Sequence, residues 1–331
     1  MQLYRLENLG NIESVSPHDE PKPTPGHGEV LIEVKANSVN FRDIKLVLGQ
    51  YPVAMKPRVI PLSDASGLVA EVGPGVAGLK VGDRVVNAFY PTWQGGPTTK
   101  GQESYGADSD GWLTAFKVVR AEAVLPMPSH LTFEEAATLP CAAVTAWNAL
   151  AGIRPGETVL TQGSGGVSTF AIQFAKAVGA RVISTSSSDP ERLKKLGSDL
   201  VINTLDLPEW AQVVQDATKG VGVDRIVEVG GPGTLAQSIK AVAYGGEIVI
   251  VGARAAKGGE PGIEFASLFA SQAKLRCVGV GSRSDMAAML KAVETAKIHP
   301  VIEIVYPFSE ARKALDHYVN RRVFGKVVIR H

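Results

Sequence analysis

The spacing of apolar and polar residues divides the sequence into two parts. Up to about residue 122 the apolar residues occur in short β-type runs, such as residues 30–34 and 84–86, separated by Gly and Pro. These runs predict a small antiparallel β-barrel, with residues 41–48 as one helical exception. From about residue 131, runs of β-branched residues alternate with helix-like segments. This second pattern predicts a parallel sheet with crossover helices.

The parallel part contains six candidate strands. They are expected at residues 158–161, 181–185, 200–203, 225–229, 247–251 and 275–279. Six strands joined by helices fit a doubly wound sheet. Two further β-type runs follow near the C-terminus, at 301–306 and 326–329, with helices expected at 286–296 and 309–318. We therefore predict an α/β protein in which residues 1–122 and 283–331 form one domain and residues 123–282 form the other.

A glycine-rich turn follows the first parallel strand and opens a helix-like segment. Glycine permits a tight turn and lets backbone N–H groups approach a pyrophosphate, which then lies at the positive end of the helix. Ser168 stands where the usual pattern has a third glycine, and its small side chain still permits close packing. The turn predicts a Rossmann dinucleotide site, with a purely structural turn as the alternative. The phosphate contacts are expected from Gly163, Gly165, Gly166 and Val167.

The end of the next strand indicates which dinucleotide binds. Ser186 lies where a carboxylate would bind the ribose of NAD, and Ser187 and Ser188 supply no carboxylate either. These hydroxyls can donate hydrogen bonds to a 2′-phosphate, and Arg192, Lys194 and Lys195 on the next helix add positive charge. We therefore expect NADP(H), with an ordinary serine-rich loop beside a solvated basic helix as the alternative. Asp189 is expected to be a helix N-cap.

The chain as a whole resembles the medium-chain dehydrogenases/reductases, and within them the zinc-free, quinone-oxidoreductase-like branch, also labelled zinc-type alcohol dehydrogenase-like. Besides the glycine turn, the resemblance rests on residues 37–43, 49–52, 73–76 with 81–85, and 136–140. It implies a GroES-like β-barrel domain and a Rossmann domain, nicotinamide chemistry, and a homodimer or homotetramer.

The resemblance also shows where the usual metal ligands are missing. Relatives with catalytic zinc bind it through a cysteine, a histidine and a further cysteine or acid, and here Asn40 and Ser63 stand at the first two positions. Cys141 is left, and a catalytic zinc needs about three protein ligands. The chain has 2 cysteines, so it also lacks the four that hold structural zinc in relatives. We expect no metal, and expect Cys141 to be a buried core residue rather than a reactive thiol.

Without a metal, hydride transfer depends on positioning and on hydrogen-bond donors at the developing oxyanion. The side chains that the resemblance places near the nicotinamide are those of Asn40, Asp43, Tyr51 and Ser63. Asn40, Tyr51 or Ser63 could polarise a substrate oxygen. The structural alternative is that Arg42 or Arg58 holds Asp43 in an ion pair and that Tyr51 packs in the barrel wall.

Further cofactor contacts follow from the resemblance alone. They are Thr145 near the nicotinamide, Val251, Gly252 and Ala253 at the carboxamide, Gly230 on the adenosine side, and Lys326 at the pyrophosphate. The alternative for Lys326 is a lysine on an edge strand that prevents further pairing.

The composition of the chain indicates which classes of binding partner to expect. The 34 basic and 33 acidic residues give a net charge of +1 without blocks of like charge, so nothing favours nucleic acid. The low cysteine content fits a reducing compartment, and no apolar stretch is long enough for a signal peptide or a membrane span. We expect a cytoplasmic protein with a small-molecule substrate.

These features together favour a zinc-independent, NADPH-dependent oxidoreductase that reduces quinones, enones or aldehydes. A zinc-free alcohol dehydrogenase that runs toward oxidation uses the same residues and differs in substrate and direction. A non-catalytic NADPH-binding protein is a third hypothesis, and it predicts affinity for the cofactor without turnover.

Overall fold

The chain folds into two compact units. The computed structural model describes residues 1–187, 189–252 and 263–331. The first unit comprises Met1–Val144 and Gly281–His331, and the second comprises Thr145–Val280. The C-terminal residues therefore return to the first unit, as the β-type runs near the C-terminus predict.

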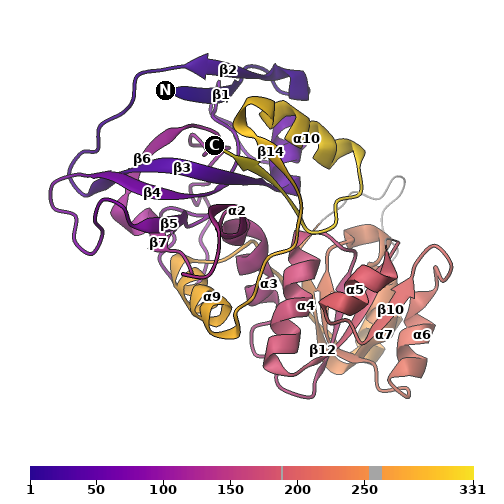
Figure 1. The fold of residues 1–331 in the computed structure, drawn as a ribbon. Coiled ribbons are helices and arrows are strands. Elements are labelled where there is room, and N and C mark those ends of the chain that lie inside the picture. Colours follow the sequence, from indigo (N-terminus) through magenta and orange to yellow (C-terminus); the bar gives the residue numbers. More distant parts are fainter. Residues whose placement is uncertain (188, 253–262) are drawn as a thin grey trace. The chain divides into compact units, whose positions relative to one another are not determined.

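The first unit is built on a seven-stranded sheet, with a two-stranded sheet beside it, in the described part of the chain (Figure 1). The large sheet has the order β14-β15-β3-β4-β5-β7, and β6 also pairs with β3. All of its pairs are antiparallel except β14 with β15. The strands are β1 (Gln2–Leu6), β2 (Val15–Asp19), β3 (Glu29–Val39), β4 (Asp64–Val72), β5 (Arg84–Asn87), β6 (Phe116–Arg120), β7 (Val124–Pro126), β14 (Ile302–Pro307) and β15 (Lys326–Arg330).

Among the helices of the first unit, two that pack on its strands explain why this unit continues to Val144. The helices are η1 (Ile12–Ser14), α1 (Phe41–Val47), η2 (Ala121–Ala123), α2 (Phe133–Ala136), the π-helix η3 (Leu139–Ala143), α9 (Arg283–Ala296), η5 (Phe308–Glu310) and α10 (Ala311–Asn320). The first unit extends to Val144 rather than to residue 122 because α2 packs on β3 and β4 and η3 packs on β4 and β5.

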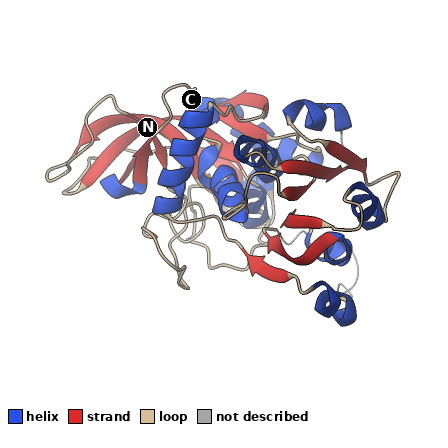
Figure 2. Cartoon of the chain, turned by 90° about the horizontal axis from the view of Figure 1, so that it is seen from below, coloured by secondary structure: helices blue, strands red, loops and turns tan. Residues whose placement is uncertain are grey.

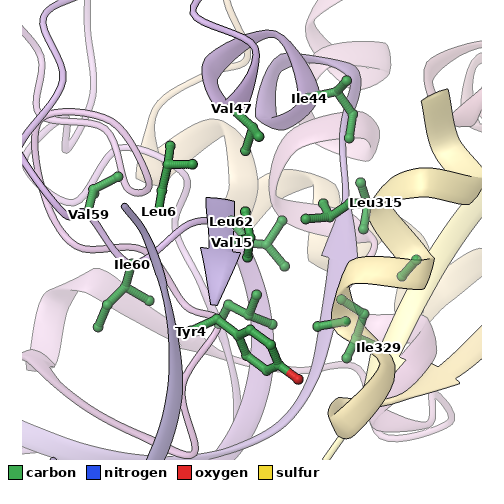
Figure 3. Close-up of a cluster of buried hydrophobic side chains, with 14 of the residues drawn as sticks. Tyr4, Leu6, Val15, Ile44, Val47, Val59, Ile60, Leu62, Leu315 and Ile329 are labelled. Atoms are coloured by element: carbon green, nitrogen blue, oxygen red, sulfur yellow. The ribbon is translucent and has the colours of Figure 1, made fainter. Parts of the chain in front are cut away.

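The two ends of the chain share one hydrophobic core in this unit. Figure 3 shows Tyr4 and Leu6 of β1 and Ile44 of α1 in one buried cluster with Leu315 of α10 and Ile329 of β15. The α10 residues that join the cluster are spaced at helical intervals, which gives this helix a single apolar face. Burial of each leucine or isoleucine contributes roughly 1.5–3 kcal/mol, so the cluster binds the C-terminal elements firmly to the first unit.

The second unit is a parallel sheet of six strands in the described residues. Its strands are β8 (Thr158–Gln162), β9 (Arg181–Ser186), β10 (Leu200–Asn203), β11 (Val223–Glu228), β12 (Val242–Ile250) and β13 (Lys274–Cys277). They pair in parallel in the order β10-β9-β8-β11-β12-β13. This is the strand order of a doubly wound Rossmann sheet. From β8 the chain adds strands first on one side, as β9 and β10, and then on the other side, beginning with β11. All six strands overlap the segments predicted from the sequence.

Figure 2 shows the helices of this unit packed around its strands. They are α3 (Val144–Ala149), which begins at the last residue of the first unit, α4 (Gly166–Val178), α5 (Pro190–Leu196), α6 (Trp210–Ala217), η4 (Gly231–Gly233), α7 (Leu235–Ala241) and α8 (Phe265–Ser271). No helix in residues 1–187, 189–252 and 263–331 is both long enough and apolar enough to cross a membrane.

Candidate functional site

In the first unit, the junction of β3 and α1 holds two of the predicted site residues, Asn40 and Asp43. The Asp43 carboxylate accepts a hydrogen bond from the Asn40 backbone N–H at 2.8 Å and lies 3.1 Å from the Arg42 guanidinium. Burial raises the pKa of Asp43, and the charge of Arg42 opposes this shift. Arg58 instead pairs with Glu7. The predicted ion pair of Asp43 therefore forms with Arg42, and the carboxylate fixes the start of α1.

A strained residue precedes Ser63. Leu62 has a φ of 71°, a left-handed conformation that costs a residue with a branched side chain about 1–3 kcal/mol. The surrounding chain enforces it, because the Leu62 carbonyl accepts the Trp112 N–H at 2.9 Å and its side chain is buried. Gly111 is required beside it, since a Cβ there would lie 2.2 Å from the Leu62 oxygen.

Asn87 holds the same segment from the other side. Its side-chain amide donates to the Ser63 carbonyl at 2.9 Å and accepts from the Ala65 N–H at 2.7 Å. Asn87 is the last residue of β5 and is buried, so its amide is set by the sheet. The positions of Ser63 and Asp64 are thus determined by fixed neighbours.

Four buried side chains join these elements into what we call the polar chain: Lys326, Asn40, Ser63 and Asp64. The Lys326 Nζ donates to the Val39 carbonyl at 2.8 Å and to the Asn40 Oδ1. The Asn40 Nδ2 donates to the Ser63 Oγ at 3.3 Å, and the Ser63 hydroxyl donates to the Asp64 Oδ1 at 2.7 Å. The polar chain therefore runs in one direction, from an amine donor to a carboxylate acceptor.

The ends of the polar chain influence one another electrostatically. Burial raises the pKa of Asp64 to about 6, and the charge of Lys326 limits the rise. Burial lowers the pKa of Lys326, and the charge of Asp64 opposes that shift. Each group thus favours the charged form of the other in a region from which water is excluded.

Cys141 completes the surroundings of Asp64. Its backbone N–H donates to the Asp64 Oδ2 at 3.1 Å. Cys141 lies in the π-helix η3 and is partly buried, so the prediction of a buried core residue is met only in part. Desolvation, together with the charge of Asp64, raises the pKa of its thiol.

These donors do not fit a catalytic zinc. An amide and a hydroxyl stand at the Asn40 and Ser63 positions, and neither is among the thiolate, imidazole and carboxylate groups that bind zinc in proteins. Within residues 1–187, 189–252 and 263–331, no three His, Cys, Asp or Glu side chains are placed to hold a metal ion.

Two structural alternatives in the first unit prove wrong. Tyr51 does not pack in a barrel wall, since it is 41% exposed and its ring centroid lies 5.9 Å from the Arg42 guanidinium carbon. Lys326 is not on an edge strand, because β15 lies between β14 and β3 and the lysine is 2% exposed. Tyr51 takes no part in the polar chain, whereas Lys326 begins it.

In the second unit, the glycine turn is tight and leaves open space before α4. Gly163 has a φ of 72°, and a methyl group at Gly163 or Gly165 would meet no atom within 4 Å. No described side chain caps Gly165, the N-cap of α4. The Ser168 hydroxyl is buried and donates to the Gln162 carbonyl, which explains why serine is accepted here. The leading N–H groups of α4 thus border open space at the positive end of the helix.

The other predicted cofactor residues lie at the carboxyl ends of neighbouring parallel strands. Ser186 ends β9, Gly230 follows β11, and Val251 and Gly252 follow β12. Because these strands pair in parallel, their ends meet at the edge of the sheet that carries the glycine turn. The remaining described residues of the prediction are Thr145 in α3, Gly166 and Val167 at the start of α4, Ser187, and Arg192 in α5. Ser188 and Ala253 lie outside the described residues.

Asp189 caps α5 as predicted. Its carboxylate accepts hydrogen bonds from the backbone N–H groups of Glu191 and Arg192, at 3.0 and 3.4 Å. The cap fixes the start of the helix that carries Arg192.

A buried network that the sequence did not reveal joins two of the strand ends. The Glu228 carboxylate accepts from the Gln162 Nε2 at 2.7 Å and from the Gly230 and Gly231 N–H groups at 3.0 and 2.9 Å. Thr234 and Ser238 also donate to it. Gln162 and Glu228 are the last residues of β8 and β11, so the network fixes the loop after β11 to the strand that carries the glycine turn.

Comparison with known proteins is consistent with both units. Residues 26–129 match the family model for the alcohol dehydrogenase GroES-like domain, and residues 166–295 match that for a zinc-binding dehydrogenase. A zinc-type alcohol dehydrogenase-like protein of Schizosaccharomyces pombe is 39% identical over 98% of this chain and 97% of its own length. The chain belongs to the medium-chain dehydrogenase/reductase superfamily. It is accordingly a nicotinamide-dependent oxidoreductase by family, with a GroES-like domain and a Rossmann domain.

Members of this superfamily that resemble the chain differ in activity. The solved structure of an NAD-dependent alcohol dehydrogenase is similar to it with a TM-score of 0.92 and 34% identity, covering 100% of both chains. An acryloyl-coenzyme A reductase of Metallosphaera sedula is 28% identical over 97% of each chain. Oxidoreductase chemistry is common to these relatives, whereas the substrate differs.

Proposed function

We propose that the chain is a zinc-independent, NADPH-dependent oxidoreductase that reduces quinones, enones or aldehydes by hydride transfer. The observation that supports this proposal is the polar chain, which joins Asn40 and Ser63, the two residues that by the family resemblance replace metal ligands of zinc-dependent relatives. A neutral hydrogen-bond donor such as the Asn40 amide can polarise a carbonyl or quinone oxygen without a metal.

The second unit supplies the cofactor side of the proposal. The open glycine turn and the uncapped N-terminus of α4 fit a pyrophosphate. Ser186 and Ser187 stand where NAD-selective sites carry a carboxylate, and Arg192 follows on α5. These residues would bind the 2′-phosphate, and Thr145, Gly230, Val251 and Gly252 would orient the nicotinamide and adenosine ends. Bound NADPH would supply the hydride.

The first unit would supply the groups that act on the substrate. Asn40 would donate a hydrogen bond to the substrate oxygen as negative charge develops on it, through the Nδ2 hydrogen that Ser63 does not accept. Ser63 would hold this amide, because its own hydroxyl proton goes to Asp64. Tyr51 is exposed enough to contact substrate. Asp43 would act indirectly, because its carboxylate is already bound by Arg42 and the Asn40 N–H.

A second candidate is an alcohol dehydrogenase that runs toward oxidation. It is favoured by the names of the Schizosaccharomyces pombe relative and of the NAD-dependent structural neighbour. The same residues serve both directions, so assays in both directions with matched substrate pairs distinguish the two.

The experiment that tests the proposal begins with binding. The purified chain is titrated with NADPH and NADH by nicotinamide fluorescence, and a panel of quinones, enones and aldehydes is then added while cofactor absorbance is followed. We expect tighter binding of NADPH and turnover of at least one compound. Binding without turnover in either direction would support a non-catalytic NADPH-binding protein, and no binding of either cofactor would overturn the assignment of the glycine turn.

Arg192→Ala tests the preference for NADPH separately. We expect it to weaken NADPH about tenfold or more and to leave NADH nearly unchanged, because only NADPH carries the 2′-phosphate. Lys240→Ala, at an exposed lysine of α7 in the same unit, is the matched control. Equal losses for the two cofactors in Arg192→Ala would remove Arg192 from the 2′-phosphate site.

The low cysteine content of the sequence continues to support a cytoplasmic location, which we propose on that basis.

A further inference from the structure

We propose that Lys326 is a positioning residue for the reaction, acting by fixing the side-chain amide of Asn40. This inference rests on the proposed function and differs from the role that the family resemblance gives Lys326, which is a contact to the pyrophosphate. Its basis is the direction of the hydrogen bonds in the polar chain.

The amide of Asn40 has two orientations of nearly equal shape, and Lys326 selects one of them. A lysine amine donates hydrogen bonds, so the group that faces it must be an acceptor. The Asn40 Oδ1 therefore faces Lys326, and the Nδ2 faces Ser63. In the opposite orientation, two donors would face each other across a buried contact, and neither would have an acceptor there.

The selected orientation determines what Ser63 can do. With Nδ2 as its neighbour, Ser63 accepts from Asn40 and gives its own proton to Asp64. A reversed Asn40 would offer an acceptor to Ser63, which would compete with Asp64 for that proton. The direction of every later hydrogen bond in the polar chain thus depends on the first one.

The protein itself fixes Lys326 in this place. Its backbone N–H donates to the Val301 carbonyl at 3.0 Å, and its strand pairs with β14 and β3. The preceding Gly325 has a φ of 83°, and a Cβ there would lie 2.2 Å from the Val301 oxygen. Two of the lysine's N–H groups are bound to Val39 and Asn40 within the same unit. No ligand is needed to hold the side chain in position.

The test is a double-mutant cycle with Lys326→Met and Asn40→Ala, measured by kcat, cofactor Kd and urea midpoint. Methionine keeps the length of the lysine and removes its donors. We expect Lys326→Met to lower kcat about 100-fold and to change the NADPH Kd by less than about threefold. In the Asn40→Ala background it should have little further effect on kcat, because its route to the reaction is already removed.

Two further variants separate positioning from a general loss of structure. Asn40→Asp keeps an acceptor for Lys326 and removes the donor to Ser63, so we expect it to lower kcat with Lys326 still in place. Lys117→Met is the matched control. It removes another lysine of the same unit, whose Nζ contacts the rings of Tyr105 and Trp112 outside the polar chain, and should leave kcat unchanged.

Two results would overturn the inference. If Lys326→Met weakens NADPH about tenfold or more in both backgrounds with kcat unchanged, Lys326 is a phosphate ligand. If the effects of Lys326→Met and Asn40→Ala on kcat and on the urea midpoint are additive, the two side chains are not coupled.

The urea midpoints are measured without substrate, so the coupling between Lys326 and Asn40 can be tested separately from the proposed function. Coupled midpoints in a protein that turns over no panel compound would overturn the proposed function and the reaction role of Lys326. They would still support the fixed orientation of Asn40.

Discussion

Asp64 is the residue whose chemistry differs most from what its surroundings in the sequence indicate. It is wholly buried, it receives hydrogen bonds from Ser63 and from the Cys141 N–H, and its pKa is raised to about 6. Lys326 limits this shift without removing it. The polar chain therefore ends at a carboxylate that titrates within a range accessible to experiment.

The raised pKa of Asp64 predicts how stability depends on pH. Because the pKa in the folded protein lies above its ordinary value of 3.8, the group stabilises the fold fully below about pH 4 and loses this contribution as pH rises through about 6. The contribution is about 3 kcal/mol. Asp64→Asn should abolish it, so that the difference between variant and parent in urea unfolding changes between about pH 4 and about pH 7.

The lost hydrogen-bond geometry in Asp64→Asn adds an offset that does not depend on pH, and only the pH-dependent part tests the claim. Asp206→Asn, on the exposed turn after β10, serves as the control and should show no such change. A pH-independent difference for Asp64→Asn would mean that the carboxylate has an ordinary pKa.

A single residue could be predicted when its role follows from neighbouring residues in the sequence, and could not when its role depends on distant ones. Asn40 and Ser63 could be named because they stand in recognisable segments, and Asp189 because it precedes a helix that begins with proline. The importance of Asp64 could not be predicted, since one of its hydrogen-bond partners, the Cys141 N–H, lies 77 positions away along the chain. The charge of Lys326, which limits its pKa shift, is also distant in sequence. The partial burial of Cys141 could not be predicted, because the apolar run around it does not reveal that residues 139–143 form a π-helix.

Among the elements, the turn between β8 and α4 is the one on which the proposed cofactor site depends most. It combines a left-handed glycine, open space above two glycines and a helix N-terminus that no described side chain caps. Elsewhere in the unit the glycine turn before β8 shows the same backbone conformation at Gly156, with a φ of 84° and no atom within 4 Å of an added Cβ. The two turns provide a matched pair.

Gly163→Ala should therefore lose cofactor binding, whereas Gly156→Ala should not. Both variants place an alanine in the left-handed region, so each should lose about 1–2 kcal/mol of stability. Only Gly163→Ala also adds a methyl group over the proposed phosphate site, and we expect its Kd for NADPH to rise about tenfold or more. Equal NADPH affinity in the two variants, measured by fluorescence titration, would remove the turn from the cofactor site.

The elements themselves were largely predictable. Strands of a parallel sheet are buried on both faces and read as continuous apolar runs, which is why all six could be located. Their pairing order follows from crossover chirality and the position of the glycine turn. The contact between Gln162 and Glu228 was not predictable, because the two residues meet only when β11 is placed beside β8.

For the whole molecule, we propose self-association through the edge of the second unit's sheet. The strand β13 lies at that edge, and Leu275 on it is 40% exposed. Phe265 and Phe269 of the neighbouring helix α8 are also strongly exposed. Exposed apolar side chains beside an unpaired strand are suited to covering by a second copy of the chain.

Leu275→Lys should therefore reduce the molar mass measured by light scattering from that of a dimer or tetramer toward that of a single chain. Leu205→Lys, at an exposed leucine elsewhere in the unit, is the control and should leave the mass unchanged. A parent protein with the mass of one chain at all concentrations would contradict the proposal.

The central claim is that this chain transfers a hydride from NADPH without a metal. Its most direct test is turnover of an enone or aldehyde with NADPH carrying two deuterium atoms at C4, using protein freed of metal by a chelator and checked for metal content. We expect an unchanged rate after chelation and deuterium bonded to carbon in the reduced product. Loss of activity on chelation that is restored by zinc would contradict it.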